Sequence, residues 1–534
     1  MSLPSFFSRI SDSITPLLRD EADLRSFLEG KSVRLEAPDD LELHPFHLAG
    51  FLLLVNLCAR LYPRIRVRSS QRIVDECRIV ALEINPSCDL TIAADESEAS
   101  ATLCWSCPAN ESLAVVIAPN GWEVLIDLPE AARVQPTNML VALAAAAIGA
   151  SELFRHVFCD FLANGRTSAS PGRFNVLTHA PTSAVLPDLP SNIDVGRVHL
   201  VGAGAVGQAA VYALARVSAR GTLVVVDPET ITSSNLQRYV LATDRDIGRS
   251  KCSIIERAFA KTKQIATVSV ESSWHFDHPE LQDAAIVCAA VDSEGVRIAL
   301  QAGLPLRAYN AWTQPADIGW SRHEQFGVEP CLACLYWPTR ARPNYHENVA
   351  RSTRQHELRV LAYLSARIPV DIPLQVDQIP KLPQYPIPPE ANEWTQRSFL
   401  DDVITGLGVD PQEVPSWKGK LLPELYREGI CAGALIRRQA TEVPTEMAVP
   451  LAHQSVLAGI MLITQLLVGA HAELREHRNI AMENRLDLLS GFPQLSARPR
   501  QKTPGCLCSD EDFTNAYSAK WRQAPLHVSA RSSG

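Results

Sequence analysis

The 534-residue sequence has no excess of positive charge, few lysines and few long uninterrupted apolar runs. Its 50 basic and 59 acidic residues give a net charge of −9, which argues against a protein that binds mainly nucleic-acid phosphates. Residues 1–10 lack the apolar core of a secretory signal. The apolar stretch 139–150 is too short to span a bilayer, and polar side chains interrupt 449–470. We therefore expect neither a nucleic-acid nor a membrane partner.

Cysteine, in contrast, is frequent. Thirteen cysteines without a secretory signal predict a reducing, cytoplasmic location, where clustered thiols are metal ligands or nucleophiles more often than disulfides. The 46% hydrophobic content excludes a mostly disordered chain, and the length allows two to four domains.

Alternating strand and helix patterns over residues 195–335 predict a doubly wound parallel sheet. Over residues 1–190 we expect an opening helical stretch, then the apolar segment 46–61, then strands such as Ile79–Ile84 and Leu113–Ile117, and a small-residue helix at 138–158.

A second helix rich in small residues is expected at Ala448–Ala472, similar to the one at 138–158. The two helices suggest two diverged copies of one α/β fold, although a coincidence between Ala-rich helices would look the same.

A glycine-rich turn follows the first predicted strand of residues 195–335. Gly202, Gly204 and Gly207 allow a tight turn whose N–H groups can approach a phosphate at the start of the next helix. Asp227 ends the following strand, where a carboxylate can accept hydrogen bonds from ribose hydroxyls. These four residues fit an ATP site and an NAD(P)-dependent oxidoreductase equally well.

The next segment separates these two interpretations. It contains an acidic pair, Asp227 and Glu229, then Ser-Asn-Leu-Gln-Arg at 234–238 and Gly-Arg-Ser-Lys at 248–251; Asp292 and Arg297 come later. In these motifs the chain resembles the adenylating domain of ubiquitin-activating enzymes and of ThiF-type sulfur-carrier adenylyltransferases. The resemblance covers roughly residues 195–335, and Tyr239 stands where the family often has glutamine.

The resemblance implies that the chain uses ATP and Mg²⁺. Arg238 and Lys251 would neutralise the charge on the phosphates, Asn235 would bind phosphate or ribose, and Asp292 would hold the Mg²⁺. Taken singly, Arg238 could be a solvated surface cation and Asp292 a helix cap.

Two short cysteine pairs suggest a structural Zn²⁺ site. Cys331 and Cys334 follow the nucleotide-binding pattern, and Cys506 and Cys508 lie near the end of the chain. The family has a similar arrangement, but its second pair has two intervening residues where this chain has one. Four unliganded loop thiols are the alternative. A further pair within 104–107 is expected to be packing.

Cys431 stands alone before the second small-residue helix, where thioester-forming family members carry their nucleophile. Arg437 and Arg438 could lower the pKa of its thiol. The alternative for Cys431 is a small buried side chain, as we expect for Cys252 and Cys288.

The resemblance also implies a domain layout. We expect an inactive adenylation-like domain at 1–175, a linker at 176–194, an active domain at 195–339 and 440–515, an α-rich insertion carrying Cys431 at 340–439, and a tail at 516–534. The predicted protein is a monomer with an internal pseudo-dimer.

By the same resemblance, the chain would be a bacterial ubiquitin-activating-like enzyme. It would adenylate the C-terminal glycine of a ubiquitin-like protein, form a thioester on Cys431, and transfer the protein to a conjugating-like enzyme. Such bacterial systems often serve antiviral defence, and the resemblance extends this expectation to the chain. The alternatives are an adenylyltransferase for a peptide or sulfur carrier without a thioester step, an NAD(P)-dependent oxidoreductase, and a non-catalytic scaffold.

Overall fold

The computed structural model describes residues 26–522 apart from 94–98, 110–113, 162–170, 261–263, 276–277, 315–316, 338–344, 383–384, 408–416, 426–450, 480, 489–493 and 499. The chain forms two compact units. The first comprises Met1–Trp337 with Val449–Gly534, and the second comprises Pro338–Ala448.

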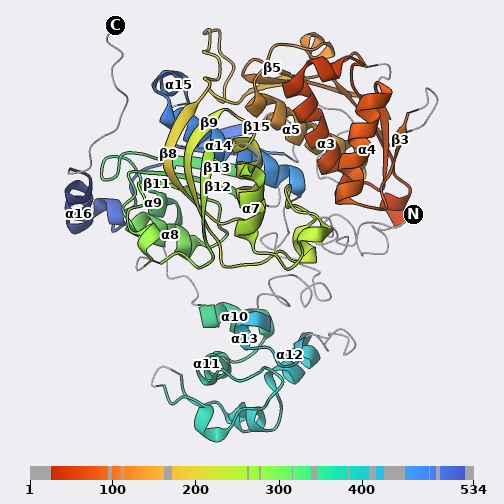
Figure 1. Ribbon diagram of the computed structural model, residues 1–534. Helices are drawn as coiled ribbons and strands as arrows, with labels where there is room; N and C mark the ends of the chain where they lie inside the picture. Colours follow the sequence, from red (N-terminus) through yellow and green to blue (C-terminus); the bar gives the residue numbers. More distant parts are fainter. Residues whose placement is uncertain are drawn as a thin grey trace. The chain divides into compact units, whose positions relative to one another are not determined.

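The N-terminal half of the first unit, red to orange in Figure 1, contains a seven-stranded sheet. The strand order is β3-β2-β1-β4-β5-β6-β7. Its strands are β1 (Val33–Glu36), β2 (Arg64–Arg68), β3 (Asp89–Ile92), β4 (Ala101–Trp105), β5 (Val115–Asn120), β6 (Glu123–Ile126) and β7 (Gly172–Asn175). Strands β3 to β5 are parallel, whereas β6 pairs antiparallel with both β5 and β7.

The second sheet of this unit has eight strands in the order β10-β9-β8-β11-β12-β13-β14-β15. They are β8 (Ile193–Val201), β9 (Ala219–Val226), β10 (Ile265–Val270), β11 (Ile286–Ala289), β12 (Arg307–Thr313), β13 (Asp317–His323), β14 (Glu483–Asp487) and β15 (Gln494–Arg498). The strands from β10 to β12 are parallel, and the remaining pairs are antiparallel.

The two sheets have the same topology. Seven strands of each follow one spatial order with the same sequence of parallel and antiparallel pairs, and the second sheet adds β15 at its edge. Val33 of β1 pairs with Ile65 and Ala101, as Val198 of β8 pairs with Leu223 and Ile286. The predicted fold class, two Rossmann-like α/β folds in one chain, is therefore confirmed.

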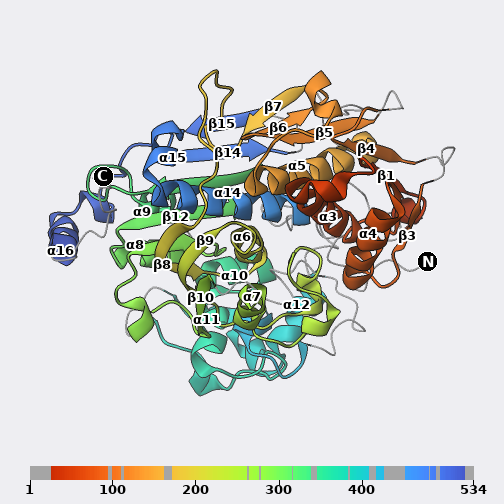
Figure 2. The ribbon, with the colours of Figure 1, turned by 45° about the horizontal axis from the view of Figure 1, so that its top comes forward.

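In the described part of the first unit the α-helices include α3 (Pro45–Ala59), α4 (Gln71–Ile84), α5 (Met139–Val157), α6 (Ala205–Leu214), α7 (Lys251–Phe259), α8 (Glu294–Ala302), α9 (Leu332–Tyr336), α14 (Ala452–Ala470), α15 (Ala472–His477) and α16 (Glu511–Arg522). Figure 2 shows α5 and α14 near the middle of the unit, with strands from both sheets above them.

Small residues allow the central helices to approach closely. A Cβ atom on Gly50 of α3 would lie 2.6 Å from the carbonyl oxygen of Ala142 in α5. One on Gly459 of α14 would lie 2.5 Å from the Cβ of Ala209 in α6. Each half therefore contains one close helix pair, which explains why α5 and α14 are rich in alanine and glycine.

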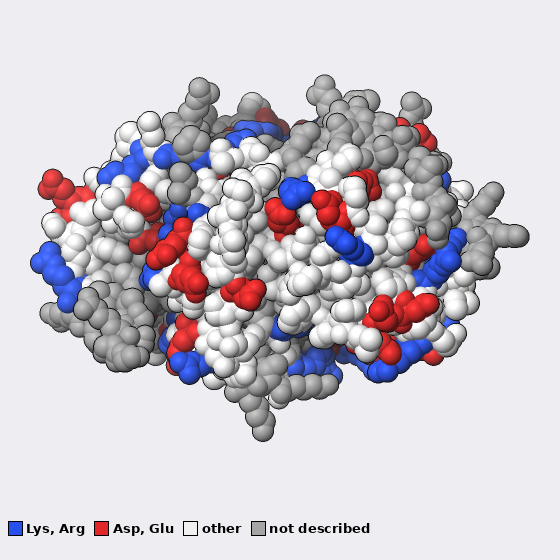
Figure 3. Space-filling view, turned by 90° about the horizontal axis from the view of Figure 1, so that it is seen from above, with Lys and Arg blue, Asp and Glu red and all other residues white. Residues whose placement is uncertain are grey.

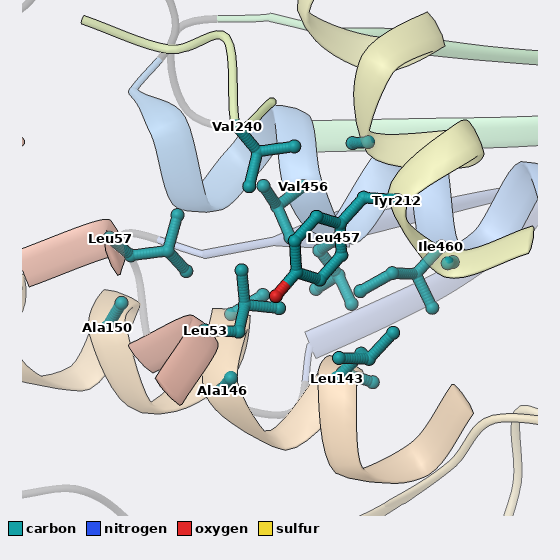
Figure 4. Packing of buried hydrophobic residues seen from close by; sticks show 14 of the residues in the cluster. Leu53, Leu57, Leu143, Ala146, Ala150, Tyr212, Val240, Val456, Leu457 and Ile460 are labelled. Carbon is teal, nitrogen blue, oxygen red and sulfur yellow. The ribbon is translucent and has the colours of Figure 1, made fainter. Parts of the chain in front are cut away.

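The two halves share a continuous apolar core at these helices. In Figure 4, Tyr212 of α6 lies among Leu53 of α3, Ala146 of α5, and Val456 and Leu457 of α14, and all five side chains are buried. Because apolar burial contributes roughly 25 cal/mol per Å², this shared core binds the halves together.

Helices α5 and α14 are both long and apolar enough to cross a membrane by length and composition. The expectation that the apolar stretch at 139–150 is too short to span a bilayer was therefore wrong, because helix α5 continues to residue 157. However, 94% of the apolar window of α5 and all of that of α14 is buried inside the protein, as in core helices.

Two expected elements were wrong. Residues Ile79–Ile84 are the end of helix α4 rather than a strand, because Ile73, Cys77 and Ala81 bury one face at helical spacing. The expected tail at 516–534 begins inside α16, whose Trp521 donates its Nε1–H to the carbonyl oxygen of Leu304 at 2.9 Å.

The second unit is helical in the residues described. It contains α10 (Tyr345–Thr353), α11 (Glu357–Ala366), α12 (Phe399–Leu407) and α13 (Leu422–Leu425), and the segments between them are short helical turns and extended chain. Its own core includes Leu358, Tyr363, Trp394 and Phe399.

The surface carries charges of both signs. On the face shown in Figure 3, acidic and basic side chains alternate among uncharged ones, without the continuous basic surface typical of a nucleic-acid-binding protein.

Buried histidines predict that acid destabilises the first unit. Burial lowers the pKa of His453 to about 3 and that of His179 to about 4, from an ordinary value of 6.5. Below pH 6.5 these histidines bind protons in the unfolded chain but not in the folded chain. The free energy of unfolding therefore decreases as the pH is lowered, until the pH reaches the folded-state pKa. At pH 5 each histidine lowers the free energy of unfolding by about 2 kcal/mol.

Urea unfolding followed between pH 7 and pH 5 tests this effect. We expect the urea concentration at the midpoint of unfolding to decrease as the pH is lowered, and to decrease less steeply in His453→Leu. If the midpoint of that variant depended on pH as steeply as that of the wild type, His453 would not be a source of the acid sensitivity.

Candidate active site

The glycine turn lies between β8 and α6 at the carboxyl edge of the second sheet. Gly202 has φ +95, and a Cβ atom there would lie 2.6 Å from the carbonyl oxygen of Ala290. A Cβ atom on Gly207 would lie 2.0 Å from the carbonyl oxygen of Gly202. Gly204 is the N-cap residue of α6 and carries no side chain over the helix end. No side chain caps the N-terminus of α6, and the N–H groups of such a helix start favour an anion.

Asp227 connects the end of β9 to this turn. Its Oδ2 accepts the N–H of Ala203 at 2.7 Å, and its Oδ1 accepts the N–H of Glu229 at 2.9 Å. Burial raises the pKa of Asp227, while the nearby Lys251 and these N–H groups act in the opposite direction. The side chain thus positions the glycine turn, and its remaining lone pairs can still accept a ribose hydroxyl.

Lys251, the first residue of α7, is paired with an acid. Its Nζ lies 2.5 Å from Oε2 of Glu229 and 5.3 Å from the ring centre of Tyr239. Burial acts to lower the pKa of Lys251, but Tyr239, Asp227 and Glu229 together raise it above the ordinary value. The ammonium group therefore stays charged, and an incoming phosphate would compete with the half-exposed Glu229 for it.

The loop at 235–242 follows the short helical turn η4 (Ser233–Asn235). The Oδ1 of Asn235 accepts the N–H of Thr232 at 2.9 Å, so this side chain shapes the turn. The N–H groups of Arg238 and Tyr239 both donate to the carbonyl oxygen of Asn235 at 3.1 Å. Arg238 is half-buried. A direct contact of Asn235 or Arg238 with a nucleotide remains a prediction.

Asp292 is exposed in the segment after β11, and Ser293 caps the following helix α8. Arg297, buried in α8, donates its Nε–H to Oδ1 of Asn310 at 3.1 Å and its Nη2–H to the carbonyl oxygen of Val291. Arg297 therefore positions the segment that carries Asp292 and is itself turned into the protein.

These groups share one edge of one sheet. The predicted residues Gly202, Gly204, Gly207, Asp227 and Asp292 all follow the carboxyl ends of β8, β9 and β11, and Lys251 reaches Glu229 at the same edge. Strands β8 and β11 are neighbours although they are not consecutive, which is the switch point where doubly wound sheets bind ligands.

The four predicted metal-binding cysteines also come together. Their sulfur atoms lie within 4.8 Å of one another and are buried. The Sγ–Sγ distances are 4.0 Å for Cys331–Cys334, 3.7 Å for Cys331–Cys506 and 3.3 Å for Cys334–Cys508. Cys506 and Cys508 are separated by one residue only, and the short helical turn η13 (Leu507–Ser509) brings both of their thiols into the cluster.

This cluster has the dimensions of a tetrahedral thiolate site. Four sulfurs at the usual Zn–S distance lie about 3.8 Å apart, close to the distances here. The N–H of Thr503 donates to Sγ of Cys334 at 3.4 Å, as expected for a thiolate. The donor set therefore fits Zn²⁺.

The predicted nucleophile Cys431, together with Arg437 and Arg438, lies outside the described residues. Cys252 and Cys288 are buried, and burial raises the pKa of both thiols, which agrees with their expected packing role.

The pair Cys104 and Cys107 lies near Glu36, with Cys104 buried and Cys107 half-buried. The carboxylate of Glu36 is already paired with Arg34 at 2.7 Å, which does not favour a cation there.

Sequence reasoning missed Arg60. This residue belongs to the N-terminal half, yet its guanidinium donates hydrogen bonds to the loop at 235–242. No local motif distinguishes it from the other 40 arginines.

Part of the chain matches a known protein family, and two relatives are similar to it in sequence. Residues 182–361 match the ThiF family. The chain is 29% identical to the protein named "Uncharacterized protein y4jF" of Sinorhizobium fredii over 98% of both chains. It is 41% identical over 73 residues to the SAMP-activating enzyme E1 of Haloferax volcanii. That match covers 14% of this chain and only 27% of the relative.

Solved structures of E. coli MccB are similar to part of the chain. The structure of MccB with MccA-N7isoASN has a TM-score of 0.33 at 12% identity and covers 59% of this chain and 67% of that one. The structure of MccB with ATP has a TM-score of 0.32 at 11% identity, with coverages of 58% and 65%.

Proposed function

Through residues 182–361 the chain belongs to the ThiF family, whose fold supports adenylation. From this premise we propose that the chain activates a ubiquitin-like protein with ATP. The reaction would join AMP to the C-terminal glycine of that protein and release pyrophosphate. A thioester on Cys431 and transfer to a conjugating-like enzyme would follow. The Haloferax relative is a SAMP-activating enzyme E1, which supports an activation reaction.

The observation that carries this proposal is the convergence of groups at the β8–β11 switch point. A helix N-terminus without a side-chain cap, the buried Lys251 and the exposed Asp292 lie at the carboxyl edge of one sheet. Positively charged and metal-binding groups at one edge of the sheet could bind a polyphosphate. They could also stabilise the negative charge that develops when its α-phosphate is attacked.

In the first proposed step, the carboxylate oxygen of the partner's C-terminus attacks the α-phosphorus of ATP. The bond from that phosphorus to the bridging oxygen breaks, and pyrophosphate leaves with the electron pair. The N–H groups of α6, Lys251 and Arg238 would stabilise the negative charge that develops. Asp292 would hold Mg²⁺, which supplies further positive charge when bound.

In the second proposed step, the thiolate of Cys431 attacks the carbonyl carbon of the acyl adenylate. The bond to the phosphate oxygen breaks, AMP leaves, and a thioester joins the partner to the chain. By its position in the sequence Cys431 belongs to the 338–448 unit, which is inserted between α9 and α14 of the adenylating half.

The N-terminal half would act as the inactive member of an internal pseudo-dimer. It repeats the strand order of the other half. Helix α3 follows β1 here as α6 follows β8, but the segment between β1 and α3 reads Ala-Pro-Asp-Asp-Leu-Glu-Leu-His and contains no glycine. We place the enzyme in the cytoplasm, with Zn²⁺ bound by the four clustered cysteines as a structural ion.

ATP–pyrophosphate exchange tests the proposal. With ubiquitin-like proteins encoded beside the gene, the wild-type chain should exchange labelled pyrophosphate into ATP. Cys431→Ala should keep exchange within about twofold, because the thiol acts after adenylation, and should lose the reductant-sensitive adduct completely. Cys159→Ala, at a half-exposed cysteine of the other half, is the control and should keep both.

Two outcomes would decide between the candidates. Absence of exchange with every partner would contradict the adenylation proposal. Exchange without any reductant-sensitive adduct in the wild type would favour an adenylyltransferase that has no thioester step.

A further inference from the structure

Arg60 connects the N-terminal half to the candidate nucleotide site. It follows α3 directly, and the residue is 1% exposed. Its Nη1–H donates to the carbonyl oxygen of Leu236, and its Nη2 donates to those of Val240 and Ala242 at 3.3 and 3.4 Å. Its Nε–H donates to Oδ1 of Asn56 at 3.0 Å. One side chain thus binds three carbonyl groups that are about 180 residues away in the sequence.

These carbonyl groups belong to the loop at 235–242. This loop carries Asn235, Arg238 and Tyr239, and its own backbone hydrogen bonds are those of short turns. Such a segment has little regular structure to fix its conformation. A guanidinium with five donors in one plane can fix several carbonyl groups in one arrangement.

The surroundings of Arg60 are unfavourable for a charge that contributes only to stability. The apolar side chains of Leu57, Leu61 and Leu451 line one small cavity together with Arg60. Within the described part of the chain no carboxylate forms an ion pair with Arg60, and burial lowers the pKa of its guanidinium to about 9. A buried cation of this kind is usually less stabilising than a well-packed apolar residue.

We infer that Arg60 is a positioning residue through which the N-terminal half fixes the 235–242 loop in its nucleotide-binding conformation. The inference rests on the proposed function, since the loop is taken to bind ATP. It gives the N-terminal half a definite task beyond covering the apolar faces of α6 and α14.

The test compares Arg60→Met with Arg155→Met in the full-length chain. Arg155 is also 1% exposed and lies in the N-terminal half, but its Nη1 pairs with Glu152 of the same helix at 2.6 Å. Each variant leaves buried acceptors without their donor, three loop carbonyl groups in one case and the Glu152 carboxylate in the other, so both should destabilise the protein. MgATP affinity is measured by calorimetry without any partner protein, and amide hydrogen exchange is measured over 236–242.

We expect Arg60→Met to weaken MgATP binding at least about tenfold and to speed exchange of the loop amides at least about tenfold. Arg155→Met should bind MgATP within about twofold of the wild type at similar loss of stability. Arg60→Lys keeps the charge but lacks the planar group of donors, and should weaken binding to an intermediate extent. It serves as the test variant if Arg60→Met does not fold.

Wild-type affinity and unchanged loop exchange in either folded Arg60 variant would overturn the inference. An equal loss of affinity in Arg155→Met would also overturn it, because a general loss of stability would then explain the effect. If the wild type itself binds no MgATP, the proposed function fails, and faster loop exchange confined to the Arg60 variants would still support the positioning role.

Discussion

Replacing Asp292 by asparagine should reduce ATP–pyrophosphate exchange by at least about a hundredfold, as expected when one charge-stabilising group is removed from a transition state. Asp292 is exposed after β11, and Arg297 positions its segment through the carbonyl group of Val291. Asparagine has the same size but lacks the negative charge that attracts Mg²⁺. The fold should therefore survive while the metal-dependent charge stabilisation is lost.

A matched control lies at the opposite end of the same strand. Asp283 is exposed before β11, so it lies far from the carboxyl edge of the sheet, and Asp283→Asn should leave exchange within about twofold. Both variants are assayed at equal MgATP with thermal unfolding as a check of the fold. Exchange by Asp292→Asn at the wild-type rate would contradict its assignment as the Mg²⁺ ligand.

Loss of one cluster cysteine should cause the second large effect, on stability. Binding of structural zinc contributes on the order of 10 kcal/mol in small domains. We therefore expect Cys334→Ser to lose zinc and to lower the free energy of unfolding by several kcal/mol. The cluster joins α9 to the η13 turn just before α16, so that C-terminal segment should become sensitive to protease.

Elemental analysis should find about one zinc per wild-type chain and much less in Cys334→Ser. The control Cys107→Ser changes a half-exposed cysteine of another Cys-x-x-Cys pair and should keep zinc and protease resistance. Full zinc content in Cys334→Ser, or no zinc in the wild type, would show that the four thiols are not a metal site.

Local sequence signals predicted most of the adenylating half correctly. The glycine turn forms because Gly202 and Gly207 leave no space for a side chain, and this requirement is visible in the spacing of the glycines. The long apolar helices 138–158 and 448–472 agree with α5 and α14 within a few residues. Helix α4 was missed in part, because six residues taken alone fit a strand as well as a helix.

The sequence could not predict contacts between distant segments. Nothing near Arg60 or Leu236 indicates that they meet, because their hydrogen bonds depend on the packing of α3 against the other half. The same applies to Glu229, which neutralises Lys251 in this structure.

The ordered polar motifs by themselves indicated the ThiF-type family, the strand and helix patterns indicated the two α/β folds, and the two short cysteine pairs indicated the four cysteines of the cluster. These properties depend on residue type and local spacing, which can be read along one chain. Tertiary structure alone decided that the four thiols lie within 4.8 Å of one another and that Arg60 reaches the 235–242 loop. Such distances arise from the packing of two homologous halves around one core, where segments far apart in the chain come into contact.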